Sequence, residues 1–465
     1  MKLHKTTMIL GGLLMNTKRV LSAVLAAVCA ASAFAGCSAK KLENSSSDAA
    51  APAESSAASQ EGGADTTERV IHHLTVWDDN QNTAAVLNGL TEEYQKDHPG
   101  VTIENEKIAQ NDLPQKIMIL ASSNSLPDIF NSDRADTNAS LIKSGQIKNA
   151  SEVLKEAGVE SCLPESVYQG LANLQGTDEM WVLPTENNIE AIWYNKKIFE
   201  ENGVTVPTTW DEFTAVCDTL KNNGVQPIAL FAKGKWGATR WIANMTFRRL
   251  GVQSIVDIND GVLSMSDPTV VDSAKILQDM NTKGYFGEGV NSVDEDIAYE
   301  MMLGGKAAMC YTGSWFTERL EGSDTIGEDM GLMAFPTFPD GKGSAGDYLC
   351  HYGLTLCIGA QNYDDALRDW IAYVFPRYGD YALENLGLLT PYTMQEEHET
   401  SYYTQLVLDE MQKVTGTGAW LEFKLPQKAS STVEDNVQPL LVSEITPEEY
   451  CQICDEAIKT ELAKQ

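Results

Sequence analysis

Short apolar runs alternate along the chain with segments whose apolar residues recur at helical spacing. The pattern predicts strands at 71–77, 101–106, 126–130, 189–194, 227–231, 303–309 and 352–358. Helices are predicted between them, one opening at Thr83 and another at Asp267. Strands that alternate with helices are typical of a parallel α/β sheet, in which ligands meet the loops beyond the carboxyl ends of the strands.

The stretch 180–224 carries the clearest local signals. A polar patch, 185–188, separates the apolar residues before Pro184 from the apolar run 189–194. Asn195 is placed to cap a short helix, and Thr209 with Glu212 has the pattern of a capping box before a longer helix. Because the patch is held between two apolar runs, we expect it to be a functional segment.

Two groups of spaced motifs carry a family resemblance. The first consists of Leu183-Pro184, Tyr194-Asn195-Lys196, Phe199, Gly203 and Pro207-Thr208-Thr209-Trp210-Asp211-Glu212-Phe213. The second is Ala308-Met309 in an apolar strand, followed by Gly313-Ser314-Trp315 opening a helix. Together they resemble the extracellular solute-binding proteins of ATP-binding cassette importers, in the large family that binds maltose and other sugars.

This resemblance covers roughly residues 70 to 460 and implies a fold like that of periplasmic binding proteins, with two α/β lobes. Lobe one would comprise 67–184 and 338–388, and lobe two would comprise 185–337 and 389–465. Three hinge crossings, near 184–188, 335–338 and 388–391, would join the lobes. Such lobes close on a ligand by hinge motion.

The N-terminal segment, 1–36, has the pattern of an export signal. Lys18 and Arg19 precede an apolar run that is too short to span a membrane as a mature helix. The run ends in Phe34-Ala35-Gly36-Cys37, which resembles a lipoprotein signal peptide and implies that Cys37 carries lipid such as palmitate. Plain secretion after cleavage near Ala35 is the alternative. Residues 37–66, rich in Ser, Ala, Glu and Gly, are expected to form a flexible tether.

Length and charge narrow the classes of function. With 465 residues, of which 43% are hydrophobic, the chain can form two lobes with buried cores. Its 34 basic residues face 66 acidic ones, which gives a formal charge of −32. A nucleic-acid backbone would be repelled by such a protein, so we expect no nucleic-acid partner. An acidic, solvated surface, which aids solubility, is the simplest explanation of the net charge.

Metal binding has little support in the sequence. Nine cysteines are present, but no two Cys-x-x-Cys pairs, so a structural zinc site is not indicated. Cys451 and Cys454 fall on a predicted helix, where two buried apolar thiols are the simpler interpretation. His72 and His73 are adjacent on a strand and therefore point to opposite faces, so they cannot bind one ion.

A sugar presents apolar C–H faces and many hydroxyls, so its site needs flat aromatic faces and side chains that make paired hydrogen bonds. From strand ends and the resemblance we predict these ligand-binding residues: Trp77, Asp79, Asn131, Asp133, Arg134, Glu186, Asn187, Asn188, Trp236, Arg240, Trp315, Asp347 and Trp420.

Trp315 is the expected stacking platform, because the resemblance places one there and Gly313 lets backbone amides approach a ligand. Trp77 and Trp236 either contact the ligand or pack against the core. Asn188 stands where relatives present a carboxylate, and Glu186 and Asn187 are neighbours that could compensate. Trp193, Trp210 and Trp370 follow buried periodicities and are expected in the core.

Three other classes of function remain to be compared. A glycosidase also needs paired acids near aromatic residues, but no nucleophile elbow, His-Glu-x-x-His, Walker loop or dinucleotide fingerprint occurs. A non-sugar solute is the second alternative: a polyamine would need several carboxylates around aromatic residues, and Arg134 with Arg240 would suit a sugar phosphate. A structural surface lipoprotein, without a small ligand, is the third.

We therefore expect a lipid-anchored carbohydrate receptor on the extracytoplasmic face of the cell membrane, and not an enzyme. It would capture an oligosaccharide between its lobes as a monomer and deliver it to the permease subunits of an importer. No cofactor and no metal are expected.

Overall fold

The computed structural model describes residues 68–464, except 133 and 423. The predicted signal peptide, 1–36, the tether, 37–66, and the candidate site residue Asp133 therefore lie outside the described residues. The elements below all belong to one unit of the chain, 62–465.

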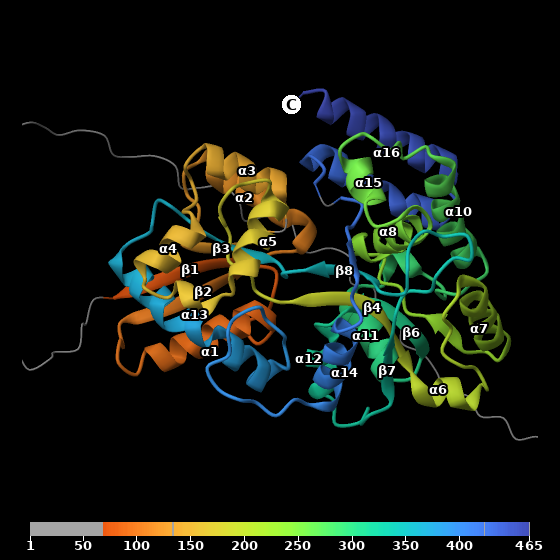
Figure 1. The fold of residues 1–465 in the computed structure, drawn as a ribbon, viewed down its shortest axis with the longest axis horizontal. Coiled ribbons are helices and arrows are strands. Elements are labelled where there is room, and N and C mark those ends of the chain that lie inside the picture. The colour runs from red at the N-terminus through yellow and green to blue at the C-terminus, as the bar shows by residue number, and fades with distance from the viewer. Residues whose placement is uncertain (1–67, 133, 423, 465) are drawn as a thin grey trace, which may run out of the picture. The chain divides into compact units, whose positions relative to one another are not determined.

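The first sheet has four strands in the order β2-β1-β3-β9 (Figure 1). β1 (Arg69–Thr75) is parallel to β2 (Val101–Lys107) and β3 (Ile129–Ser132), and β9 (Thr355–Ile358) is antiparallel to β3. The helices in this part of the chain are α1 (Asn82–Tyr94), η1 (Gln110–Asp112), α2 (Leu113–Ser122), α3 (Ala135–Lys143), α4 (Ala150–Glu156), η2 (Glu160–Cys162), α5 (Glu165–Gln175) and α13 (Asp365–Leu386).

The second sheet has the order β10-β8-β4-β6-β5, and β7 also pairs with β4. Its strands are β4 (Asn188–Asn195), β5 (Gln226–Ile228), β6 (Ala307–Gly313), β7 (Met330–Met333), β8 (Asp347–His351) and β10 (Gly416–Gly418). Its helices are α6 (Lys196–Glu201), α7 (Trp210–Asn222), α8 (Trp236–Leu250), α9 (Ser254–Asn259), α10 (Pro268–Thr282), η3 (Val290–Ser292), α11 (Glu295–Leu303), α12 (Phe316–Glu321), α14 (Tyr402–Met411), α15 (Gln427–Leu441) and α16 (Pro447–Leu462). Two sheets with their own helices confirm the predicted two-lobed α/β fold.

Local signals explain where several helices begin. The Thr209 hydroxyl accepts a hydrogen bond from the Glu212 amide, and the Glu212 carboxylate accepts from the Thr209 amide at 3.1 Å, which confirms the capping box of α7. Asn195 caps α6 through the Ile198 amide, at 3.0 Å. These caps satisfy amides that have no partner inside the helix.

The three tryptophans predicted to be structural are buried. Trp193 and Trp370 have no exposed surface, and Trp210 is 7% exposed. Trp370 belongs to the core around the first sheet, whereas Trp210 and Trp193 belong to two cores around the second. Each sheet therefore has its own packed interior.

Three segments cross between the sheets and are hydrogen-bonded to one another. The amides of Thr185 and Glu186 donate to the Tyr352 carbonyl at 3.0 and 3.2 Å, and the Asn187 amide donates to the Leu389 carbonyl at 2.8 Å. The predicted crossings near 184–188 and 388–391 lie in this group.

The second predicted crossing, 335–338, was wrong, and so was the single strand predicted at 352–358. β7 and β8 both pair with β4, so residues up to His351 stay with the second sheet. The chain crosses only between His351 and Thr355, where Gly353 has a φ of +73° and interrupts the extended run. The segment 338–351, assigned to lobe one from the sequence, therefore belongs with the second sheet.

The seven cysteines among the described residues are all free thiols, and Cys350 is the only one of them that is not buried. Cys451 and Cys454 lie on α16 with no exposed surface, as predicted.

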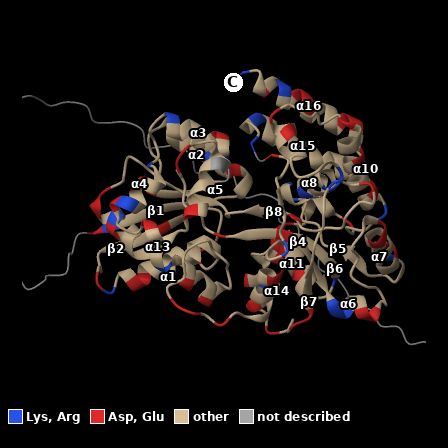
Figure 2. Cartoon of the chain, in the orientation of Figure 1, with Lys and Arg blue, Asp and Glu red and all other residues tan. Residues whose placement is uncertain are grey.

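No helix in the described part of the chain is long and apolar enough to cross a membrane. Acidic side chains are spread over helices and loops around both sheets (Figure 2).

Candidate ligand-binding site

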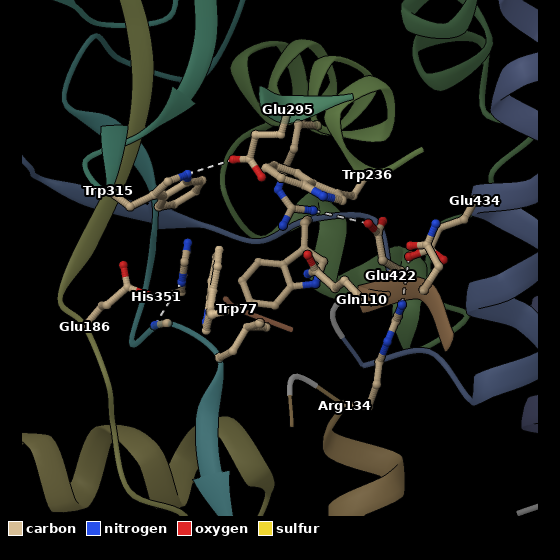
Figure 3. A pocket seen from close by; sticks show the side chains of 15 residues that line it. Trp77, Gln110, Arg134, Glu186, Trp236, Glu295, Trp315, His351, Glu422 and Glu434 are labelled. Carbon is tan, nitrogen blue, oxygen red and sulfur yellow. Dashed lines mark hydrogen bonds and ion pairs between the residues drawn. The ribbon is translucent and has the colours of Figure 1, made fainter. Parts of the chain in front are cut away.

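A pocket is lined by residues from loops of both sheets and from two of the crossing segments (Figure 3). Its lining consists of Trp77, Gln110, Asn111, Arg134, Glu186, Trp236, Arg240, Glu295, Trp315, His351, Gly353, Leu354, Trp420, Glu422 and Glu434. Four indoles and several charged side chains thus converge from distant parts of the sequence.

Trp315 is held by hydrogen bonds at the edge of its ring. Its indole N–H donates to a carboxylate oxygen of Glu295 at 2.9 Å and to the Tyr299 hydroxyl at 2.8 Å. A Cβ at residue 313 would collide with this ring, so Gly313 makes room for Trp315. Trp236 and His351 flank the ring, with centroids 6.1 and 5.4 Å away.

Glu295, which fixes Trp315, is the first residue of α11. Burial raises the pKa of Glu295, and the hydrogen bonds from Tyr299 and Trp315 oppose that shift only in part. The pocket therefore holds a carboxyl group whose charge is poorly compensated by the protein.

Arg240 forms the centre of a buried charge network. Its Nε contacts both oxygens of Glu190, at 3.0 and 3.1 Å, and its Nη1 lies 3.2 Å from Glu422. The guanidinium lies between the indoles of Trp236 and Trp420, 5.3 and 4.9 Å from their centroids. Arg240 is only 9% exposed, so this network is buried.

Glu190 anchors this network from β4. Burial would raise its pKa, but the charges of Arg240 and His351 and their hydrogen bonds outweigh burial and lower the pKa. His351 Nε2 lies 3.5 Å from Glu190, while its Nδ1 accepts a hydrogen bond from the Gly353 amide at 3.1 Å. Glu190 therefore stays ionised beneath the pocket.

Arg134 connects the two lobes at the pocket. It precedes α3, and its guanidinium contacts Glu434 at 2.7 Å and the Ser430 hydroxyl, both on α15. The side chains of Arg134 and Glu434 are each 10% exposed. This ion pair is therefore also buried.

Glu186 enters the pocket from the first crossing segment. It is 3% exposed and accepts a hydrogen bond from the Asn188 amide group at 2.7 Å. Burial raises the pKa of Glu186, and the hydrogen bond from Asn188 and the charge of His351 oppose this shift only in part. Glu186 therefore presents its carboxylate to the pocket, whereas the sequence placed the ligand contact of the hinge at Asn188.

Seven of the predicted residues line the pocket: Trp77, Arg134, Glu186, Trp236, Arg240, Trp315 and Trp420. Five others do not line it. Asn188 is buried and hydrogen-bonded to Glu186 and Ser314. Asn187 is exposed, and its amide pairs with Leu389.

The other three make structural contacts. Asn131 donates to the Leu354 carbonyl at 2.7 Å and is completely buried. Asp79 accepts from Asn105 at 3.0 Å, and Asp347 accepts from the Ser344 amide at 2.7 Å in the turn before β8. Each is used by its own loop or neighbouring strand, which explains why it does not reach the pocket.

Sequence patterns did not single out Glu295, His351, Glu422 or Glu434. Each acidic residue is one of 66, so composition could not distinguish it. His351 is a polar residue at the end of β8, but the sequence pattern predicted a strand at 352–358 instead, so this strand end was missed.

Comparisons with known proteins agree with this architecture. The sequence profile of a family described as bacterial extracellular solute-binding protein matches residues 78–375. An uncharacterised extracellular-binding protein of an ABC transporter from Pyrococcus horikoshii is 26% identical over 49% of this chain and 52% of its own length. The chain spans about half the length of the first curated relatives that it matches.

Solved structures share the fold. A chitin oligosaccharide binding protein superposes with a TM-score of 0.76 at 22% identity and covers 86% of this chain and 100% of its own. A structure concerned with xylan utilisation by Caldanaerobius polysaccharolyticus superposes with a TM-score of 0.74 at 22% identity, and covers 83% of this chain and 99% of its own.

Proposed function

Because the chain belongs to the family of bacterial extracellular solute-binding proteins, we propose that it is the substrate-binding component of a sugar importer. In this proposal it captures an oligosaccharide between its lobes as a monomer and delivers it to the membrane permease subunits. It acts by binding and release, without turnover. Lipid on Cys37 anchors it to the outer side of the cell membrane.

The four pocket indoles are the observation that carries the proposal. Sugar rings stack on such faces through their C–H groups, and buried carboxylates accept hydrogen bonds from the hydroxyls. The solved relatives whose names refer to chitin oligosaccharides and to xylan support a carbohydrate as the ligand.

Two unpartnered polar atoms add to this support. In the described chain, the indole N–H of Trp77 and one carboxylate oxygen of Glu422 are buried without a hydrogen-bond partner. Leaving a buried donor or acceptor unpaired costs about 1–3 kcal/mol. A ligand hydroxyl, which both donates and accepts, would satisfy either atom.

The test is calorimetry and thermal shift with a panel of oligosaccharides, applied to the wild type and to Trp315→Ala. A ligand that binds the folded state raises the melting temperature by mass action. Removing the Trp315 face should weaken binding by about 1–3 kcal/mol, or roughly fivefold to 150-fold.

Two controls separate stacking from stability. Trp315→Phe keeps a flat face and should retain most of the affinity, whereas Trp181→Ala removes an indole outside the pocket and should leave affinity unchanged. Equal affinity in wild type and Trp315→Ala would contradict the assigned platform. Release of shorter sugars during incubation would contradict a function without turnover.

A further inference from the structure

The charged residues of the pocket are unevenly paired. Arg240 contacts two carboxylates, Glu190 and Glu422, and Arg134 contacts a third, Glu434. Glu186 and Glu295 also line the pocket, and in the described chain neither forms an ion pair with Lys or Arg. Five carboxylates therefore face two arginines.

This arrangement is unfavourable for an anionic solute. Both arginines already bind carboxylates, so a phosphate or carboxylate group of a ligand would have to displace an internal partner. It would also approach Glu186 and Glu295, whose like charges would repel it. The sugar phosphate considered from the sequence is therefore disfavoured.

A cation would find a suitable environment instead. The guanidinium of Arg240 lies over Trp236 and Trp420, and Glu190 and Glu422 neutralise its charge. Trp77 and Trp315 provide two further indoles in the pocket, and aromatic faces attract cations. Glu186, Glu295 and Trp315 all line the pocket: the carboxylate of Glu295 lies at the edge of the Trp315 indole, and that of Glu186 lies near His351 (Figure 3). Glu422 adds a buried oxygen without a partner among the described residues.

We propose that the solute carries protonated amino groups, which the carboxylates of Glu186 and Glu295 bind beside the indole faces of the pocket. An oligosaccharide of amino sugars is the form that rests on the proposed function. A linear polyamine would offer the same chemistry from another source. Because burial raises the pKa of both carboxyls, a bound ammonium would supply the compensation that the protein lacks.

Matched probes test the amine directly. The purified protein is titrated by calorimetry with a β-1,4-linked glucosamine trimer, with cellotriose, which has hydroxyls in place of the amines, with the N-acetylglucosamine trimer, and with spermidine. We expect the glucosamine trimer to bind at least about tenfold tighter than cellotriose, the effect of one additional ionic contact. Its affinity should fall as the pH is raised and the amines lose their protons, whereas that of cellotriose should not.

Isosteric variants locate the effect. Glu186→Gln and Glu295→Gln should each weaken binding of the glucosamine trimer about tenfold more than they weaken binding of cellotriose. Glu328→Gln, which alters an exposed carboxylate outside the pocket, should change neither. The pH series on the wild type is independent of the folding of any variant.

The outcomes distinguish this inference from the proposed function. Equal binding of cellotriose or the N-acetylated trimer and the glucosamine trimer would overturn the amine but leave the carbohydrate. Binding of spermidine alone would support the amine and overturn the carbohydrate. No binding of either amine probe would overturn the inference.

Discussion

At the scale of single residues, His72 and His73 show how one position on a strand changes the chemistry. His73 is 1% exposed and hydrogen-bonded to Asn105 at 2.7 Å and to Asn131 at 3.1 Å. The side chain of His72 is 58% exposed. Burial lowers the pKa of His73 to about 4, and its two hydrogen bonds only partly oppose this. The predicted alternation of the two rings is confirmed.

His73 should make the protein sensitive to acid. A histidine in the unfolded chain titrates near pH 6.5, so between about pH 6.5 and 4 the unfolded state binds a proton that the folded state does not. The free energy of unfolding should therefore fall by about 3 kcal/mol as the pH is lowered through this window. Urea unfolding at several pH values would measure it.

The two histidines provide their own control. In His73→Gln this contribution to the pH dependence should disappear, whereas His72→Gln should keep the wild-type slope. The same slope in all three proteins would show that His73 is not the group responsible.

Residue-level predictions agree with the pocket lining where a large side chain lies two residues beyond a strand. Trp77 and Trp315 could be placed in this way, because a strand end must lie at an edge of its sheet. Asn131 occupies an equivalent position after a strand, but its amide is bound by His73 and Leu354. Which of these side chains reaches the pocket depends on neighbours distant in sequence.

At the scale of elements, the crossing segments determine how the pocket is assembled. Gly353 lies in the second crossing with a φ of +73°, and a Cβ there would collide with Thr185 and Glu186 of the first. Glycine is thus required both for the left-handed backbone and for the contact between crossings.

Gly353→Ala should destabilise the protein and weaken ligand binding, because it strains the backbone and displaces Glu186. Gly145→Ala is the matched control: residue 145 has a φ of +68°, but nothing lies within 4 Å of the added carbon. The backbone penalty, about 1–2 kcal/mol, should be common to both. Urea unfolding should show a larger loss for Gly353→Ala, and calorimetry should show weaker binding for that variant alone.

A similar loss in both variants, with unchanged affinity, would mean that the contact between the crossings is unimportant for binding.

Elements marked by local chemistry, such as α7 with its capping box, could be predicted closely. The strand predicted at 352–358 could not, because the end of β8 at His351 and the start of β9 at Thr355 depend on which sheet supplies each partner.

At the scale of the whole molecule, contacts across the pocket join segments about 300 residues apart. Besides the pair Arg134 and Glu434, the Gln427 amide donates to Asp136 at 2.6 Å. Both contacts connect the beginning of α3 with α15. They join the lobes beside the pocket, which Arg134 and Glu434 help to line.

The proposed lipid anchor has its consequence at this scale too. Cys37→Ser should abolish incorporation of labelled palmitate and release the protein from the membrane fraction, because the protein would then have no acyl chain to hold it in the membrane. Cys350→Ser, which removes a thiol of the folded body, should leave both unchanged. Labelling of Cys37→Ser at the wild-type level would contradict attachment at this residue.

The sequence by itself determined the class of fold, the local helix starts and the family, because these depend on periodicity, on caps such as Thr209 and on motifs of near neighbours. It also placed four of the aromatic residues that line the pocket. Only the tertiary structure decided that Glu186, rather than Asn188, faces the pocket and that Arg240 is neutralised by Glu190 and Glu422. Burial and charge pairing are properties of contacts between distant segments, and no local pattern contains them.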